Sequence, residues 1–406
     1  MTLAQFFESE IVRLPKSGPS DDLSFDCFLA DIFGQYISLV SQLDDSKYPT
    51  VCELIKGKVE QIKYISDEIV KTLKFYLDGH PHLAYSTFFE LLDHLKIETL
   101  FTTLAQYKMP DPLRSWVDDL LESALHPPLY RVRSDRTAAS DGALSRKDMF
   151  HVPFEKRRLV ANQRYSIAGL PSLYLGSSIW ICWEEMGRPS LNSLLVSRFR
   201  IAEPTVVLDL QFTPELAWRV FNLVQEGLPE QISESKKQTV RDRYGDKYVF
   251  SYAVFWPLIA ACSMRVHDRT GSFHPEYVIP QLLLRWVTAT EKHKVDGIRY
   301  FSTRTRNKQF DVFAHTNCVF PSRNIKPKGR CSHLRRKFHL TTPITWELLT
   351  AMKNSERFIF GPSNVGSAVQ ANSDLVINYS ATDFFAAEVE LWHLEENRDQ
   401  SKEVED

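Results

Sequence analysis

The chain has 406 residues, 43% hydrophobic and 25% charged, which is enough to bury a sizeable core in two globular units. Its formal net charge of −2 excludes a global field that would draw the whole protein onto nucleic acid or an acidic membrane, so any anion-binding site must be local. Six scattered cysteines, no secretion signal and no apolar run of about 20 residues, the length a membrane span needs, predict a cytoplasmic protein without a membrane partner.

The first part of the chain has the apolar spacing of helices. From Phe25 to about residue 123, apolar residues recur every three or four positions, most clearly over residues 54–77. Gly79 and Pro81 interrupt this pattern, because glycine can end a helix and proline cannot continue one. The sequence therefore predicts an all-helical bundle over residues 1–125, with two long antiparallel helices joined near Gly79.

The pattern changes at Pro127 and Pro128, after which residues 129–133 alternate like a strand. Further strands are predicted over 172–175, 205–210 and 297–301, and helices over 180–186, 214–224, 252–262 and 277–290. This mixture is typical of an α+β domain, which we place over residues 126–394. Residues 395–406 contain six acidic side chains and no aromatic one, so they are predicted to be a disordered tail.

The glycine-rich turns that cradle nucleotide phosphates are absent from this sequence. Neither G-x-G-x-x-G nor G-x-x-x-x-G-K-[ST] occurs, and the chain has only 15 glycines. If the protein binds a dinucleotide, side chains must therefore hold its phosphates. Candidates for such a site are Arg131, Arg164, Tyr174, Glu185 and Ser302.

Each of these residue types has a use on a dinucleotide. Guanidinium groups bind a diphosphate through two hydrogen bonds, an aromatic ring stacks on a flat base, and a carboxylate accepts bonds from ribose hydroxyls. Departure of nicotinamide from its ribose leaves an oxocarbenium-like centre, which a nearby carboxylate stabilises. Glu185 would lie about two turns into the helix that follows the Tyr174 strand. Its neighbour Glu184 remains an alternative for the same role.

Four segments resemble the successive motifs of the RES domain over about residues 126–345: Leu129–Val132, Gln163–Ser166 with Gly169 and Pro171, Leu173–Leu175 running on to Glu185, and Asp296–Ser302. Known members are bacterial toxins that consume NAD⁺ by phosphorolysis or hydrolysis, or transfer ADP-ribose. The resemblance implies an ADP-ribosyltransferase-like split sheet, with NAD⁺ as substrate and no metal. It makes Arg131 the family arginine, Glu185 the glutamate and Ser302 the serine, with Arg164 and Tyr174 as supporting ligands.

The helical part, with Gly79–Tyr85, resembles the HEPN-like domain that precedes some RES domains. Arg13 and Arg114 are the only arginines before residue 126, and neither has a histidine at the spacing of the ribonuclease motif of that class. We therefore expect a regulatory or assembly module. The resemblance implies a toxin or anti-phage effector that is restrained by a helix-turn-helix antitoxin or by its own N-terminal part. The sequence does not decide whether the protein forms a homo-oligomer. The acceptor of ADP-ribose can be water, phosphate or a protein side chain.

Two alternatives belong to other classes of protein. His315, Cys318, Cys331 and His333 carry the side chains that bind zinc, although the Cys-x-His spacing is tighter than most zinc fingers use. A basic run is typical of a nucleic-acid surface, but aromatic residues for base stacking are sparse around it, so we expect no nucleic-acid partner. That run consists of Lys326, Lys328, Arg330, Arg335, Arg336 and Lys337.

Overall fold

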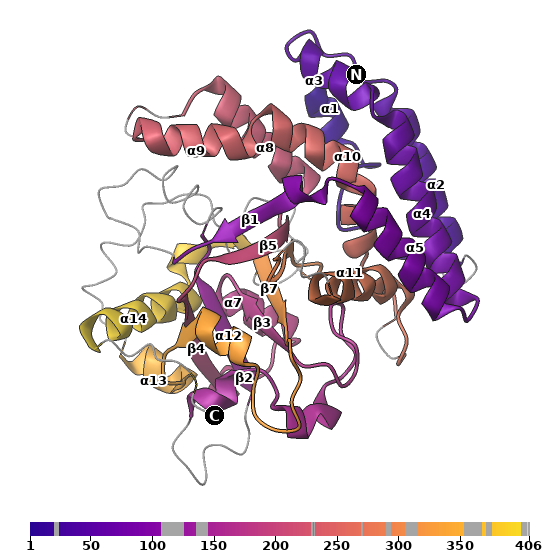
Figure 1. Ribbon diagram of the computed structural model, residues 1–406. Coiled ribbons are helices and arrows are strands. Elements are labelled where there is room, and N and C mark those ends of the chain that lie inside the picture. Colours follow the sequence, from indigo (N-terminus) through magenta and orange to yellow (C-terminus); the bar gives the residue numbers. More distant parts are fainter. Residues whose placement is uncertain are drawn as a thin grey trace. The chain divides into compact units, whose positions relative to one another are not determined.

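The computed structural model describes residues 1–19, 24–106, 126–134, 145–228, 230, 232–268, 271–289, 294–304, 316–352, 368–370, 376–398 and 404. The chain forms two compact units, both visible in Figure 1. Unit 1 takes residues 1–101, 162–165 and 212–293, and unit 2 takes residues 102–161, 166–211 and 294–406. The predicted α+β class is confirmed. The predicted boundary near residue 126 divides the chain once, whereas each compact unit contains segments from both sides of that boundary.

Unit 1 is helical. Its elements are α1 (Leu3–Glu8), α2 (Phe25–Val40), α3 (Pro49–Lys56), α4 (Val59–Leu77), α5 (Pro81–His94), η1 (Ile97–Leu100), α8 (Pro214–Glu226), α9 (Glu234–Tyr244), α10 (Asp246–Cys262), η5 (Pro275–Tyr277) and α11 (Val278–Ala289). As predicted, α4 ends at Leu77 and α5 begins at Pro81. Gly79 lies between them at φ 83°, a conformation that glycine adopts without strain.

The centre of unit 1 is α10, which is apolar almost all round and buried from Ser251 to Cys262. It contacts α3, α4, α8, α9 and α11. Trp256 of α10 stacks on Tyr36 of α2, and the Tyr36 hydroxyl donates to the carbonyl of Ala253 at 2.6 Å. Among the helices that the structure describes, none has both the length and the apolar character of a membrane span.

Unit 2 is built on a nine-stranded sheet with the order β1-β5-β6-β7-β3-β2-β4-β8, in which β9 also pairs with β4. The strands are β1 (Phe101–Leu104), β2 (Leu129–Ser134), β3 (Ser172–Gly176), β4 (Leu194–Ile201), β5 (Thr205–Leu210), β6 (Gly297–Phe301), β7 (Thr316–Pro321), β8 (Phe338–Leu340) and β9 (Ile344–Thr345). A separate two-stranded sheet pairs β10 (Ala368–Gln370) with β11 (Val376–Asn378). The remaining elements are η2 (Arg146–Met149), η3 (Phe154–Leu159), α7 (Ile179–Glu185), η4 (Leu191–Ser193), α12 (Ser332–Lys337), α13 (Trp346–Ala351), η7 (Tyr379–Ala381) and α14 (Asp383–Arg398).

The large sheet is weakly joined at its middle. β3 pairs with β7 through five residues and β2 pairs with β4 through six, but β2 and β3 share only the pair Tyr130 and Gly176. Continued antiparallel pairing would set Val132 opposite Tyr174, and this pair is not formed. The sheet therefore consists of two well-paired parts, β1-β5-β6-β7-β3 and β2-β4-β8, that meet at one residue pair.

The two faces of the sheet have separate cores. On one face, α7, α13 and α14 pack against Tyr130 and Val132 of β2. On the other face, Leu129 of the same strand packs with Phe150, Leu334 and other buried apolar residues. Because neighbouring residues of a strand point to opposite faces, this division also assigns sides to the polar residues of β2.

The structure departs from the sequence-based expectations at both ends of the sheet unit. Phe101–Leu104 forms β1, although these residues fall within the predicted all-helical region, because they gain a strand partner in β5. Residues 395–398, predicted to belong to a disordered tail, continue helix α14. Val404 belongs to the same buried apolar cluster as Phe150, and residues 399–403, 405 and 406 of the predicted tail lie outside the described residues.

His151 is fully buried in the core of unit 2, between the rings of Phe150 and Phe154. Its Nε2 accepts a hydrogen bond from the N–H of Cys331 at 2.9 Å, so the proton is on Nδ1, which lies 2.8 Å from the carbonyl oxygen of Val152. Both ring nitrogens are satisfied only in the neutral form. Burial lowers the pKa of His151 from 6.5 to about 4.

We expect His151 to make the stability of the protein depend on pH between about 6.5 and about 4. In this range the unfolded state binds the proton and the folded state does not, so the free energy of unfolding falls as the pH is lowered, by at most about 1.4 kcal/mol per pH unit. Urea unfolding of the wild type and of His151→Gln at several pH values measures this slope. The variant should have the shallower dependence, and equal slopes would contradict the assignment.

Candidate functional site

Helix α7 is fixed closely against strand β3. Ser178 is the N-cap, and its Oγ accepts a hydrogen bond from the N–H of Ile181 at 3.0 Å. Gly176 allows the close approach, because a Cβ at this position would lie 2.6 Å from Cγ2 of Ile181 and 2.7 Å from Sγ of Cys182. The helix ends at Glu185, which presents its carboxylate to the strands beyond β3.

The Glu185 carboxylate is held by three side chains. Its Oε1 accepts hydrogen bonds from Oγ of Ser302 at 2.6 Å and from Nδ2 of Asn317 at 2.9 Å. Its Oε2 lies 3.2 Å from Nε of Arg304. About a third of the side chain remains exposed (32%), so the acid is fixed in orientation and still reachable from solvent. A charged group held in this way needs no reorganisation to stabilise a developing positive charge.

The partners of Glu185 come from two neighbouring strands. Ser302 directly follows β6, Asn317 lies on β7, and these strands pair antiparallel with Tyr300 opposite Asn317. The Ser302 hydroxyl also accepts a hydrogen bond from the N–H of Arg304 at 3.1 Å. The predicted meeting of Glu185 with Ser302, 117 residues apart in the chain, is therefore present in the structure.

Glu184 points elsewhere. It is buried, and its Oε1 lies 2.6 Å from an Nη atom of Arg188, one helical turn further along the chain. Arg188 also lies over the ring of Trp183. Of the two adjacent carboxylates, the structure therefore brings Glu185, and not Glu184, to Ser302 and Asn317.

Tyr174 lies on β3 with its hydroxyl 2.7 Å from Oγ of Ser166. By strand alternation it shares a face of the sheet with Gly176, against which α7 packs. Tyr174 is thus on the same face as Glu185, and Ser166, from the predicted Gln163–Ser166 motif, holds its hydroxyl.

Arg131 lies on β2 between Tyr130 and Val132, and charge interactions with Cys182 of α7 and with Tyr174 act on its pKa. Its Nη1 is buried, and no described residue accepts a hydrogen bond from it. Burial, assisted by the nearby charge of Arg133, lowers the pKa of Arg131 to about 10, so the side chain remains cationic at neutral pH. A buried, charged N–H group that lacks an acceptor within the protein is available to bind an anion.

Arg164 belongs to unit 1. Its guanidinium donates to the carbonyl oxygens of Cys262 at 3.2 Å and Met264 at 2.7 Å and lies over the ring of Tyr277. These contacts tie the 162–165 segment to the end of α10. Its predicted contact with a diphosphate stays a prediction, as does the convergence of Arg131 with Glu185.

Sequence reasoning did not find two of the residues that touch Glu185. These two residues are Arg304 and Asn317. The position of Asn317 directly before the apolar run Cys318–Phe320 was the one available indication. Even so, its partner became evident only from the pairing of β7 with β6.

The structure gives no support to the zinc interpretation. Among the residues it describes, no three His, Cys, Asp or Glu side chains are placed to hold a metal ion. Cys318 is buried, and burial raises the pKa of its thiol to about 12, whereas zinc binds the thiolate. His333 lies 2.8 Å from Oδ1 of Asp296. His315 lies outside the described residues.

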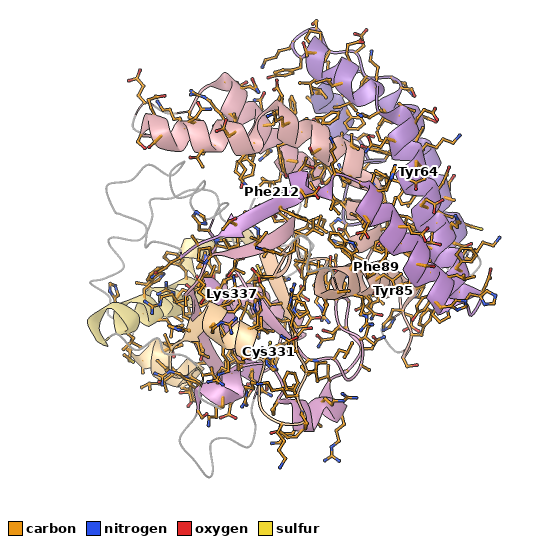
Figure 2. All side chains as sticks on the ribbon, in the orientation of Figure 1. Tyr64, Tyr85, Phe89, Phe212, Cys331 and Lys337 are labelled. Carbon is orange, nitrogen blue, oxygen red and sulfur yellow. The ribbon has the colours of Figure 1, made fainter. Side chains whose placement is uncertain are left out.

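The basic run is partly committed to internal contacts. Lys337, labelled in Figure 2 near Cys331, lies 3.2 Å from Oδ2 of Asp296, and Arg330 donates to the carbonyl oxygen of Lys147 at 2.8 Å. These side chains hold α12 and the preceding loop on the sheet unit. Part of the positive charge of this run is therefore used in contacts within the protein.

Comparison with known proteins gives one informative match. The chain is 33% identical over 339 residues to the putative toxin YopC of Bacillus subtilis (strain 168), and the match covers 82% of this chain and 68% of that protein. No protein-family model and no solved structure matches the chain. With this extent and identity, the chain belongs to the family of the putative toxin YopC.

Proposed function

We propose that this protein is an NAD⁺-degrading enzyme that breaks the bond between nicotinamide and ribose and acts as a bacterial toxin or anti-phage effector. The observation that carries the proposal is the hydrogen bond between Ser302 and Glu185. These are two of the three residues for which the RES family is named, and the resemblance requires them to share one site.

Three further observations support the proposal. The sheet divides between β2 and β3, as expected for an ADP-ribosyltransferase-like split sheet. Arg131, the third family residue, has a buried cationic N–H that no described residue accepts. The relative from Bacillus subtilis is named a putative toxin. An enzyme that depletes NAD⁺ would be toxic to the cell that contains it.

In this proposal the residues have separate roles. Glu185 faces the ribose and stabilises the positive charge that develops as the glycosidic C–N bond breaks and nicotinamide leaves with the bonding electrons. Ser302 and Asn317 hold its carboxylate in place, and Arg304 is positioned to bind a phosphate or ribose oxygen beside it. Tyr174 stacks on nicotinamide or its ribose, and Arg131 neutralises the diphosphate.

Water or phosphate completes the reaction by adding to the ribose carbon and losing a proton. A protein side chain in the same place would make the protein an ADP-ribosyltransferase, which is the second candidate, because the same site activates the same bond. A cytoplasmic enzyme of this kind needs restraint. We propose a helix-turn-helix antitoxin or the helical unit for that role, with assembly into a homo-oligomer also open.

The decisive experiment is incubation of the purified chain with NAD⁺, with and without phosphate, followed by chromatography and mass spectrometry of the products. Nicotinamide with ADP-ribose identifies hydrolysis, and nicotinamide with a phosphorylated ADP-ribose that forms only with phosphate identifies phosphorolysis. Modified protein in a lysate identifies transfer. Complete recovery of NAD⁺ with phosphate, without phosphate and in the lysate would refute the proposed function.

A further inference from the structure

Helix α14, close to the C-terminal end of the chain, supports α7 at two points. The ring of Phe384 lies 5.3 Å from the ring of Trp183, near the end of α7. At the start of α7, Oε1 of Glu388 accepts hydrogen bonds from the N–H of Ile179 and from the hydroxyl of Tyr379, both at 2.6 Å. Glu388 is buried, and 209 residues separate it from Ile179 in the chain.

The contact with Ile179 satisfies a need of the short helix. The first N–H groups of a helix have no partner within it, and the partial positive charge at this end favours an acceptor that carries negative charge. Ser178 satisfies the N–H of Ile181, and Glu388 satisfies the N–H of Ile179. The start of α7 is therefore fixed by a residue of another element.

Helix α7 has only seven residues, from Ile179 to Glu185. A helix this short moves as a rigid body, so a shift at its first residue moves its last residue by a similar amount. Because Glu185 meets Ser302 at 2.6 Å and Asn317 at 2.9 Å, a displacement of about 1 Å would break one or both hydrogen bonds.

We infer that Glu388 is a positioning residue for Glu185. It holds the start of α7 from α14 and thereby sets where the acid at the other end of the helix meets Ser302 and Asn317. This inference rests on the proposed function, because it assigns a catalytic consequence to the position of Glu185. Misplacement of a catalytic group by about 1 Å can cost on the order of 10² in rate.

A double-mutant cycle tests this inference. Glu388→Ala and Glu388→Gln are made in the wild type and in Glu185→Gln, and kcat and KM for nicotinamide release from NAD⁺ are measured. Glu388→Ala should lower kcat by about tenfold or more, with KM changed by less than about threefold, because positioning acts on the chemical step. Glu388→Gln should retain most of the activity, because its amide oxygen can accept the same two hydrogen bonds. In the Glu185→Gln background, Glu388→Ala should have no further effect.

The controls separate positioning from general loss of structure. Glu347→Gln, at an exposed glutamate of the same unit, should leave kcat and KM unchanged. If Glu388→Ala fails to fold, Tyr379→Phe takes its place in the cycle, because it removes one partner of the same carboxylate; it should lower kcat severalfold in the wild type only. An equal loss of kcat in both backgrounds, or an unchanged kcat in the wild-type background, would overturn the positioning role of Glu388 and leave the proposed function standing. A wild type that releases no nicotinamide would overturn the proposed function, and the inference would fail with it.

Discussion

Glu185→Gln is expected to lower the rate of nicotinamide release by on the order of 10² or more while the fold is retained. The amide has the size of the acid, and one oxygen remains to accept hydrogen bonds from Ser302 and Asn317. What is lost is the negative charge that would stabilise the oxocarbenium-like ribose. Steady-state rates of nicotinamide release, with circular dichroism to verify the fold, measure this effect.

Glu184→Gln is the matched comparison, because it removes the same charge one residue earlier. Its carboxylate pairs with Arg188 and not with Ser302, so we expect a rate close to that of the wild type. A wild-type rate in Glu185→Gln together with a low rate in Glu184→Gln would transfer the catalytic role to Glu184. Wild-type rates in both variants would show that neither acid takes part in the chemistry.

The second large effect is expected on stability. Arg299 of β6 is completely buried, and its Nε donates to Oδ1 of Asp209 on the neighbouring strand β5 at 3.1 Å. Asp209 also accepts a hydrogen bond from the hydroxyl of Thr102 at 2.9 Å. Asp209→Asn leaves the buried guanidinium without its counter-charge, and we expect it to lower the free energy of unfolding by about 3–5 kcal/mol.

Urea denaturation followed by circular dichroism measures this loss. The control is Glu53→Gln, which removes one carboxylate from the exposed pair with Lys56 and should change the free energy of unfolding by less than about 1 kcal/mol. A similarly small effect of Asp209→Asn would show that Arg299 finds another acceptor. Because Arg299 lies three residues before Ser302, the activity of this variant should fall as well.

Local patterns predicted the elements that have strong local determinants. The bounds of β5 and β6 match the predicted strands at 205–210 and 297–301, and the break between α4 and α5 falls at Gly79 and Pro81 as predicted. In each case the residues themselves restrict the backbone: apolar and β-branched runs favour strands, and glycine and proline end helices.

Strands β4 and β7 were not predicted, although each pairs with at least two other strands of the sheet. Arg198 and Arg200 make β4 resemble an exposed segment, yet Arg198 is buried against the ring of Trp392 from α14. β7 begins with two polar residues, Thr316 and Asn317. The sequence pattern predicts that a charged or polar side chain in a strand is exposed, because burial requires a polar partner. Periodicity contains no information about partners that lie far away in the chain.

The amino-acid sequence by itself determined the α+β class, the helical character of residues 25–94, and the set of residues from which a site could be built. Only the tertiary structure decided that Glu185 faces Ser302 while Glu184 turns to Arg188, and that Asn317 and Arg304 complete the group. The physical reason is that helix and strand periodicities depend on neighbours a few residues apart. The meeting of residues more than 100 positions apart depends on strand order and on how α7 packs, which the whole chain decides together.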